Sequence, residues 1–96
     1  MPFMRITRSR FDPANAEEME SIRPELAAAL QRQPGLQHLH GGIDREGGRG
    51  ITVAIFDTRE HAGYSPETLG PILVNMQSLG LQIESREVYE VTGDAE

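Results

Sequence analysis

The first segment of the chain alternates apolar and polar side chains. Between Phe3 and Phe11, Met4 and Ile6 share one parity, and the other parity carries Phe3, Thr7 and Phe11. Successive side chains of an extended chain point to opposite faces, so a period of two predicts a β-strand. We therefore expect a first strand over Phe3 to Phe11.

A helical spacing follows this strand. Asp12-Pro13 offers an N-cap with a proline just inside it, and Asn15 offers a second possible cap. Apolar residues then recur every three or four positions, at Met19, Ile22, Leu26, Ala29 and Leu30. They form one face of an amphipathic helix. Pro24 predicts a kink or a fresh start near Ser21 to Arg23, and Gln33-Pro34-Gly35 ends the helix.

Two further strands are expected in the middle of the chain. Leu36 to Asp44 predicts the second strand and Gly50 to Phe56 the third. The loop between them, Arg45 to Arg49, contains two glycines and suits a hairpin. These two strands should therefore be antiparallel neighbours.

The last part of the chain predicts a second helix and a fourth strand. Arg59 to Gly63 can form a short helical turn, and Ser65-Pro66-Glu67 caps a longer helix that ends at Gly80. The apolar face of this helix consists of Leu69, Ile72, Leu73, Met76 and Leu79. Alternation resumes from Leu81 to Val91, which predicts the last strand.

The order of elements is β-α-β-β-α-β, which is the split βαβ arrangement of a ferredoxin-like α+β fold. We expect one four-stranded antiparallel sheet in a single domain over residues 1–96, with residues 1–2 and 93–96 frayed at the ends. A chain of 96 residues is long enough for one hydrophobic core.

The third strand is apolar on both faces. Ile51, Val53 and Ile55 point one way, whereas Ala54 and Phe56 point the other. A ferredoxin-like sheet carries helices on only one face, so apolar side chains on the other face indicate an interface. We therefore expect a homodimer packed sheet on sheet.

Composition excludes several classes of function. The nine basic residues are all Arg and are scattered among fifteen acidic ones, giving a net charge of −6. No basic stripe could neutralise a row of phosphates, which disfavours nucleic acid and anionic membranes as partners. The absence of Cys excludes disulfides and thiolate chemistry. With no leader-like or membrane-spanning apolar stretch, we expect a cytoplasmic protein.

Several short stretches carry a family resemblance. They are Pro34-Gly35 before the second strand, Gly41-Gly42 late in it, Phe56-Asp57-Thr58-Arg59-Glu60-His61-Ala62 after the third, and the closing Glu87-Val88-Tyr89-Glu90-Val91. Over nearly its whole length the chain resembles the antibiotic-biosynthesis-monooxygenase-like dimeric α/β-barrel proteins. The resemblance implies a dimeric α/β barrel with a pocket between sheet and helices.

Members of that family include cofactor-independent oxygenases of aromatic phenols and quinols, and haem-degrading enzymes. This chain departs from them at two positions. It has Phe56 where these enzymes usually carry a Trp, and Ser65 where many carry a His, with His61 arriving earlier. Both departures count more against haem degradation than against cofactor-free oxygenation.

His38 and His40 stand two apart on the second predicted strand, so they share a face at a separation of roughly 7 Å. Two ligands of one metal could span this distance, with His61 or a distant Glu as a third. No carboxylate or Cys accompanies them locally, so a structural or pocket-lining role is the preferred interpretation and no metal is assigned. A neutral imidazole in a pocket can accept a phenolic proton, which makes both catalytic candidates.

Other candidates come from the second helix and its approach. Asn75 interrupts an apolar run and could bind a substrate oxygen, although an outward-facing amide is the alternative. We take it as a third catalytic candidate. The residues expected to contact a substrate are Tyr64, Phe56, His61 and Met76.

Two functions compete at this point. The first is oxygenation of a small aromatic compound without metal, flavin or other cofactor, which needs desolvation, proton removal and exclusion of water. The second is a non-catalytic dimer that binds a small ligand or assists another enzyme. A pocket of several hundred Å³ lined by His and Asn would favour the first, and a filled interior the second.

Overall fold

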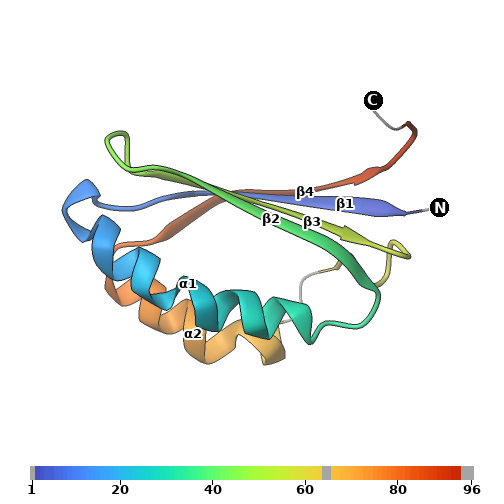
Figure 1. Cartoon of the computed structure of the whole chain (residues 1–96), viewed down its shortest axis with the longest axis horizontal. Helices are drawn as coiled ribbons and strands as arrows, with labels where there is room; N and C mark the ends of the chain where they lie inside the picture. The colour runs from blue at the N-terminus through green and yellow to red at the C-terminus, as the bar shows by residue number, and fades with distance from the viewer. Residues whose placement is uncertain (1, 64–65, 94–96) are drawn as a thin grey trace.

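The computed structural model describes residues 2–63 and 66–93. Its elements follow the predicted order (Figure 1). They are β1 (Phe3–Arg10), a 3₁₀ turn (Pro13–Asn15), α1 (Ala16–Gln31), β2 (Leu36–Asp44), β3 (Arg49–Phe56), α2 (Pro66–Ser78) and β4 (Gln82–Glu90). The ferredoxin-like α+β fold is thereby confirmed. No helix in the described ranges is both long and apolar enough to cross a membrane.

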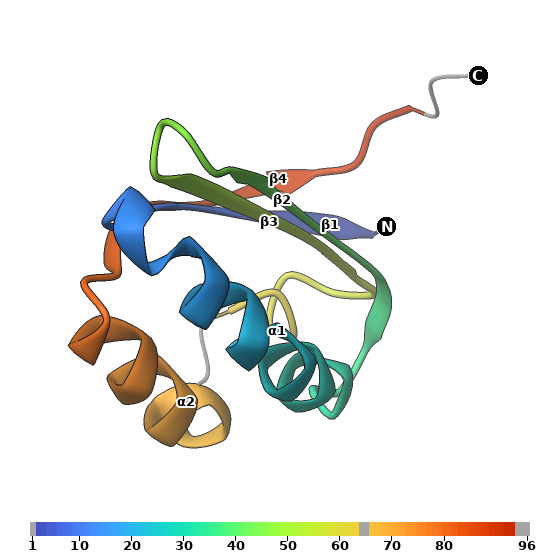
Figure 2. The same cartoon turned by 60° about the vertical axis from the view of Figure 1, so that its left-hand side comes forward.

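The four strands form one antiparallel sheet in the order β2-β3-β1-β4. β1 lies in the middle and pairs with β3 on one side and β4 on the other. Both helices cover the same face of the sheet and leave the opposite face bare (Figures 1 and 2). Alternate residues of the central strand therefore face the helices.

α1 starts after a capped turn. The Asp12 carboxylate accepts a hydrogen bond from the Ala14 N–H at 2.9 Å, as expected for a cap. The helix then runs unbroken from Ala16 to Gln31, so the fresh start expected near Pro24 does not occur. Pro24 is exposed, and a helix carbonyl on the solvent side can bond water in place of the missing N–H.

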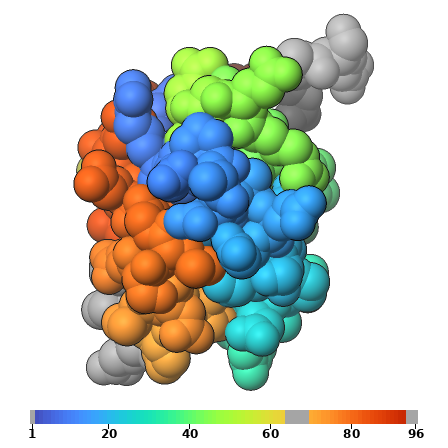
Figure 3. Space-filling view, turned by 90° about the vertical axis from the view of Figure 1, so that its left-hand side faces the viewer, coloured from blue at the N-terminus to red at the C-terminus, as the bar shows by residue number. Residues whose placement is uncertain are grey.

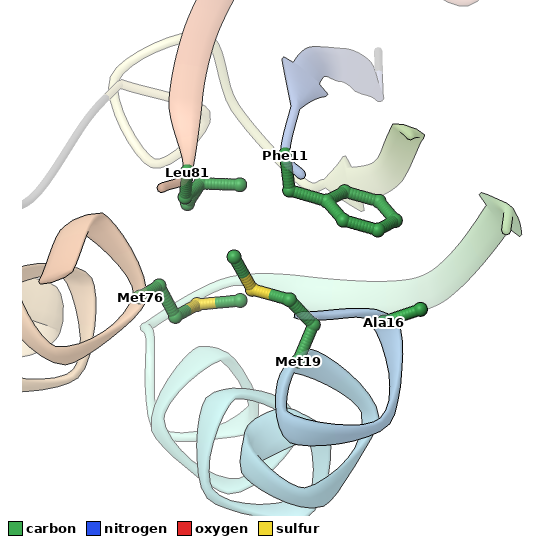
Figure 4. Packing of buried hydrophobic residues seen from close by; sticks show 5 residues of the cluster. All are labelled: Phe11, Ala16, Met19, Met76 and Leu81. Atoms are coloured by element: carbon green, nitrogen blue, oxygen red, sulfur yellow. The ribbon is translucent and has the colours of Figure 1, made fainter. Parts of the chain in front are cut away.

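The main core cluster lies where the two helices meet one end of the sheet. It joins the end of β1, the start of α1, the end of α2 and the start of β4, and Figure 4 shows its five residues: Phe11, Ala16, Met19, Met76 and Leu81. The space-filling view shows α1 and α2 side by side at this end, beneath the β2–β3 hairpin (Figure 3). The Asn15 amide also donates to the Leu79 carbonyl at 2.6 Å. These contacts hold the two helices together over the sheet.

Both faces of β3 are apolar, as the sequence predicted. Ala54 and Phe56 are completely buried on the helix-covered face. Val53 and Ile55 pair with Ile6 and Met4 of β1 and point to the helix-free face, where they are only partly buried. The helix-free face therefore has an apolar centre.

Candidate functional site

The central feature of the site is a cavity of about 100 Å³ between the sheet and the two helices. Its floor is polar because β1 turns Arg5, Thr7 and Ser9 toward the helices, and the register places Thr52 and Arg86 on either side of Thr7. Its other walls are mostly apolar, and their residues are Leu26, Leu30, Leu73, Met76, Leu81 and Ile83. The cavity thus combines polar groups on one side with an apolar cover.

A second cavity of about 110 Å³ adjoins the first and shares Ser9, Thr52 and Met76 with it. It extends toward β2, where Gly41 and Gly42 carry no side chain. Arg23 reaches across from α1 and donates to the Gly41 carbonyl at 3.2 Å. The space beneath the helices therefore opens beside an exposed arginine at the edge of the sheet.

Arg5 is the most unusual residue of the floor, because its guanidinium is buried with only 5% of the residue exposed. Nη1 donates to the carbonyl oxygens of Ala62 at 3.4 Å and Gly63 at 3.1 Å, and Nη2 donates to Gln33 Oε1 at 3.1 Å. The guanidinium also lies over the ring of Phe56. Arg5 thus links the central strand to the segments that follow α1 and β3.

The surroundings of Arg5 disfavour its charged form and lower its pKa. Burial lowers its pKa from the usual value, and the nearby Arg86 guanidinium lowers the pKa further by like-charge repulsion. Even so, an arginine stays protonated in a protein. The floor of the cavity therefore carries positive charge.

An Asp–His pair lies in the segment between β3 and α2. His61 Nδ1 and Asp57 Oδ1 are 2.6 Å apart, and this hydrogen bond is the main cause of the lowered pKa of Asp57. Gly35 has a φ of +79°, and a Cβ at this position would collide with both side chains.

The helical turn predicted at Arg59 to Gly63 consists of hydrogen-bonded turns, with Ala62 N donating to the Thr58 carbonyl at 3.1 Å.

The structure separates the three residues predicted to be catalytic. Leu39 packs under the helices, so His38 and His40 on either side of it point to the helix-free face, where both are exposed. Asn75 is exposed on α2. None of the three lines the cavities described above. We expected these three side chains to converge in one pocket beneath the helices, and in the described chain they do not.

The residues predicted to contact a substrate are also spread out. Met76 lines both cavities. Phe56 lies beneath the Arg5 guanidinium, and His61 is bonded to Asp57 outside the cavities. Tyr64 lies outside the described residues. Within those residues, no three His, Cys, Asp or Glu side chains are grouped so that they could hold a metal ion.

Sequence reasoning missed the polar floor. Arg5 lies between Phe3 and Thr7 in the parity that the alternation assigns to one face of β1. A charged residue at a position that faces the core is the signal that could have identified it, because such residues are rarely buried without a specific partner.

Comparison with known proteins identifies the fold. No family model and no curated protein matches the sequence. Among solved structures, SnoaB from Streptomyces nogalater, a cofactor-independent oxygenase, is 20% identical with a TM-score of 0.73, over 97% of this chain and 95% of that one. HapK from Hahella chejuensis is 12% identical with a TM-score of 0.74, over 100% and 97%.

A third similar structure, from Chloroflexus aurantiacus, is provisionally assigned as an antibiotic biosynthesis monooxygenase. It is 13% identical with a TM-score of 0.71, over 100% of this chain and 98% of that one. The chain therefore shares the fold of antibiotic-biosynthesis-monooxygenase-like proteins, as the sequence resemblance predicted.

Proposed function

We propose that this protein acts as a cofactor-independent monooxygenase on a small aromatic compound bound between the sheet and the helices. The observation that carries the proposal is the pair of adjoining cavities, whose apolar cover and polar floor lie beneath both helices. The likeness in fold to a cofactor-independent oxygenase supports the same function. Shared fold alone would not assign the chemistry, so the cavity carries the argument.

The cavities suit an aromatic ring with one polar edge. Leu26, Leu73 and Met76 would contact the ring faces, and the hydroxyls of Thr7 and Thr52 could bond a ring oxygen. Each cavity alone is smaller than one that holds benzene, about 150 Å³, and neither has the several hundred Å³ or the His and Asn lining expected for oxygenation. A bicyclic ring would have to occupy both adjoining cavities. The catalytic roles of His38, His40 and Asn75 stay untested predictions, and none of these side chains lines the cavities in which the aromatic compound would bind.

The reaction can be tested with 1-naphthol and dissolved oxygen. One oxygen atom would become the new carbonyl of 1,4-naphthoquinone, and the other would leave as water with the two hydrogens that the naphthol loses. We expect one O₂ consumed per quinone formed, with EDTA present and no metal or flavin added. Binding without oxygen uptake would instead favour the non-catalytic ligand-binding function, and the absence of both would overturn the proposal.

The homodimer is the second part of the proposal. Met4, Ile6, Val53 and Ile55 form an apolar centre on the helix-free face, and a second copy would remove it from water. Tyr89 is 48% exposed on the neighbouring strand β4 and donates a hydrogen bond to Glu87. Sedimentation at micromolar concentration should give twice the chain mass, and a stable monomer would remove this part of the proposal.

A further inference from the structure

We infer that the cavity selects ligands with an anionic oxygen on an aromatic ring, a carboxylate or a phenolate, and that Arg5 is the group that holds this oxygen. The inference rests on the proposed function for the location of the ligand. Beyond that function, it specifies that the ligand is negatively charged and that Arg5 recognises the charge.

The first observation is a buried cation without a counter-charge. Among the side chains that the structure describes, in residues 2–63 and 70–93, no carboxylate lies within 4.0 Å of the Arg5 guanidinium. Its hydrogen-bond partners are neutral oxygens of Gln33, Ala62 and Gly63. Burying a charge costs free energy that neutral partners only partly offset. An anion bound beside Arg5 would offset more of this cost.

The second observation is spare donor capacity in the same cluster. A guanidinium has five N–H donors, and the hydrogen bonds of Arg5 within the described chain use three of them. Gln33, which accepts from Arg5, is 95% buried, and its Nε2 has no hydrogen-bond partner among the described residues. The buried donor left without a partner is therefore the Gln33 amide, which adjoins Arg5 but does not itself line the cavity. Such donors are rare in folded proteins and call for an acceptor.

The third observation is the lining of the cavity that Arg5 shares. Arg86 lies on the same floor, and its charge acts on Arg5. The hydroxyls of Thr7 and Ser9 lie between apolar side chains and can donate to an oxygen. The remaining walls are aliphatic or thioether groups, which suit a ring rather than a phosphate or sugar. Charge and lining together indicate an aromatic anion.

A matched pair of ligands tests this inference on the wild-type protein. 1-Naphthoate and 1-naphthamide have nearly the same shape and differ by one negative charge. Calorimetry at pH 7 should show tighter binding of the naphthoate by at least about tenfold, because hydrogen bonds to a charged group are the stronger ones. Equal affinity for both compounds would overturn the anion selectivity while leaving the aromatic site intact. If neither compound bound, the proposed site itself would be wrong.

Variants then locate the effect. Arg5→Lys should keep most of the preference for naphthoate and Arg5→Gln should abolish it. Arg10→Gln serves as the matched control, because Arg10 lies on the same strand but is exposed and paired with Glu84 at 2.9 Å. A preference that survives in folded Arg5→Gln would contradict the role of Arg5.

Arg5→Gln removes buried hydrogen bonds and could fail to fold, so a measurement on the wild type complements it. The Nε–Hε resonance of Arg5 in ¹⁵N-labelled protein should move on addition of 1-naphthoate and much less on addition of 1-naphthamide. The Nε–Hε resonance of Arg10 should stay in place with both compounds. A shift at Arg10 with none at Arg5 would place the anion elsewhere and overturn the inference.

Discussion

The guanidinium carbon of Arg5 lies 4.9 Å from the centre of the Phe56 ring, within the range of a cation–π contact. The two residues belong to paired strands, β1 and β3, and both are buried on the helix-covered face. Phe56 thereby supports the guanidinium from one side while Gln33 and the 62–63 carbonyls hold its donors. A charged group is fixed in this way in the layer between the sheet and the helices.

Shortening Phe56 should destabilise the protein strongly. Phe56→Ala removes a fully buried ring and leaves a cavity under Arg5, so we expect a loss of about 3–5 kcal/mol in the free energy of unfolding. Ile51→Ala is the control, because Ile51 is 36% exposed and should cost less than about 1.5 kcal/mol. Urea unfolding followed by circular dichroism measures both, and similar losses would show that the Phe56 ring is not buried as described.

A charge on the helix-free face should affect association rather than folding. Ile55→Asp places a carboxylate at the apolar centre, opposite Met4 and His38. In the single chain this position is only partly buried, so the variant should fold and sediment as a monomer. Val74→Asp is a matched control on the exposed face of α2, where the residue is 62% exposed. A dimeric Ile55→Asp variant would contradict the sheet-on-sheet arrangement.

Filling the cavity from its floor should block turnover. Thr52 lines both cavities, and Thr52→Leu adds volume there at a cost of about 1–3 kcal/mol in stability. We expect 1-naphthol oxidation to fall by at least about tenfold in this variant. Thr92→Leu changes an exposed residue beyond β4 and should leave the rate unaltered. Full activity in Thr52→Leu would show that the substrate binds elsewhere.

The Asp57–His61 hydrogen bond should make a pH-dependent contribution to stability. The pKa of Asp57 in the folded state lies below its ordinary value of 3.8, with the bond from His61 as the largest cause. Stability from a depressed carboxyl pKa is present above the unfolded value and is lost as the pH falls through the folded value. The difference in Tm between wild type and Asp57→Asn should therefore be larger at about pH 5 than at about pH 2 and shrink as the pH falls below 3.8. A difference that does not change down to pH 2 would show that the pair does not depend on the carboxylate charge.

The order of elements could be predicted because apolar residues recur every second position in the strands and every three or four positions in the helices. The two faces of β3 were also predictable, since Phe56 and Ile55 fall on opposite parities. Pro24 left a kink and a fresh start open as alternatives, and the unbroken helix excludes the fresh start. The sequence could not decide between them, because the outcome depends on whether the freed carbonyl can reach water.

The orientation of His38 and His40 could not be decided from the second strand alone. Both of its faces are largely polar, so parity separates the histidines from Leu39 without showing which face the helices cover. Pairing of His38 with Ile55 and of His40 with Val53 settles the matter in the folded chain. The polar floor of the cavity arises from three strands, so no single segment of the sequence displays it.

The most direct test of the account is a crystal structure of the protein soaked with 1-naphthol. We predict ligand density between β1 and the helices, with the ring against Leu73 and Met76 and the oxygen near Arg5. Density on the helix-free face beside His38 and His40, with the space beneath the helices empty, would contradict the account.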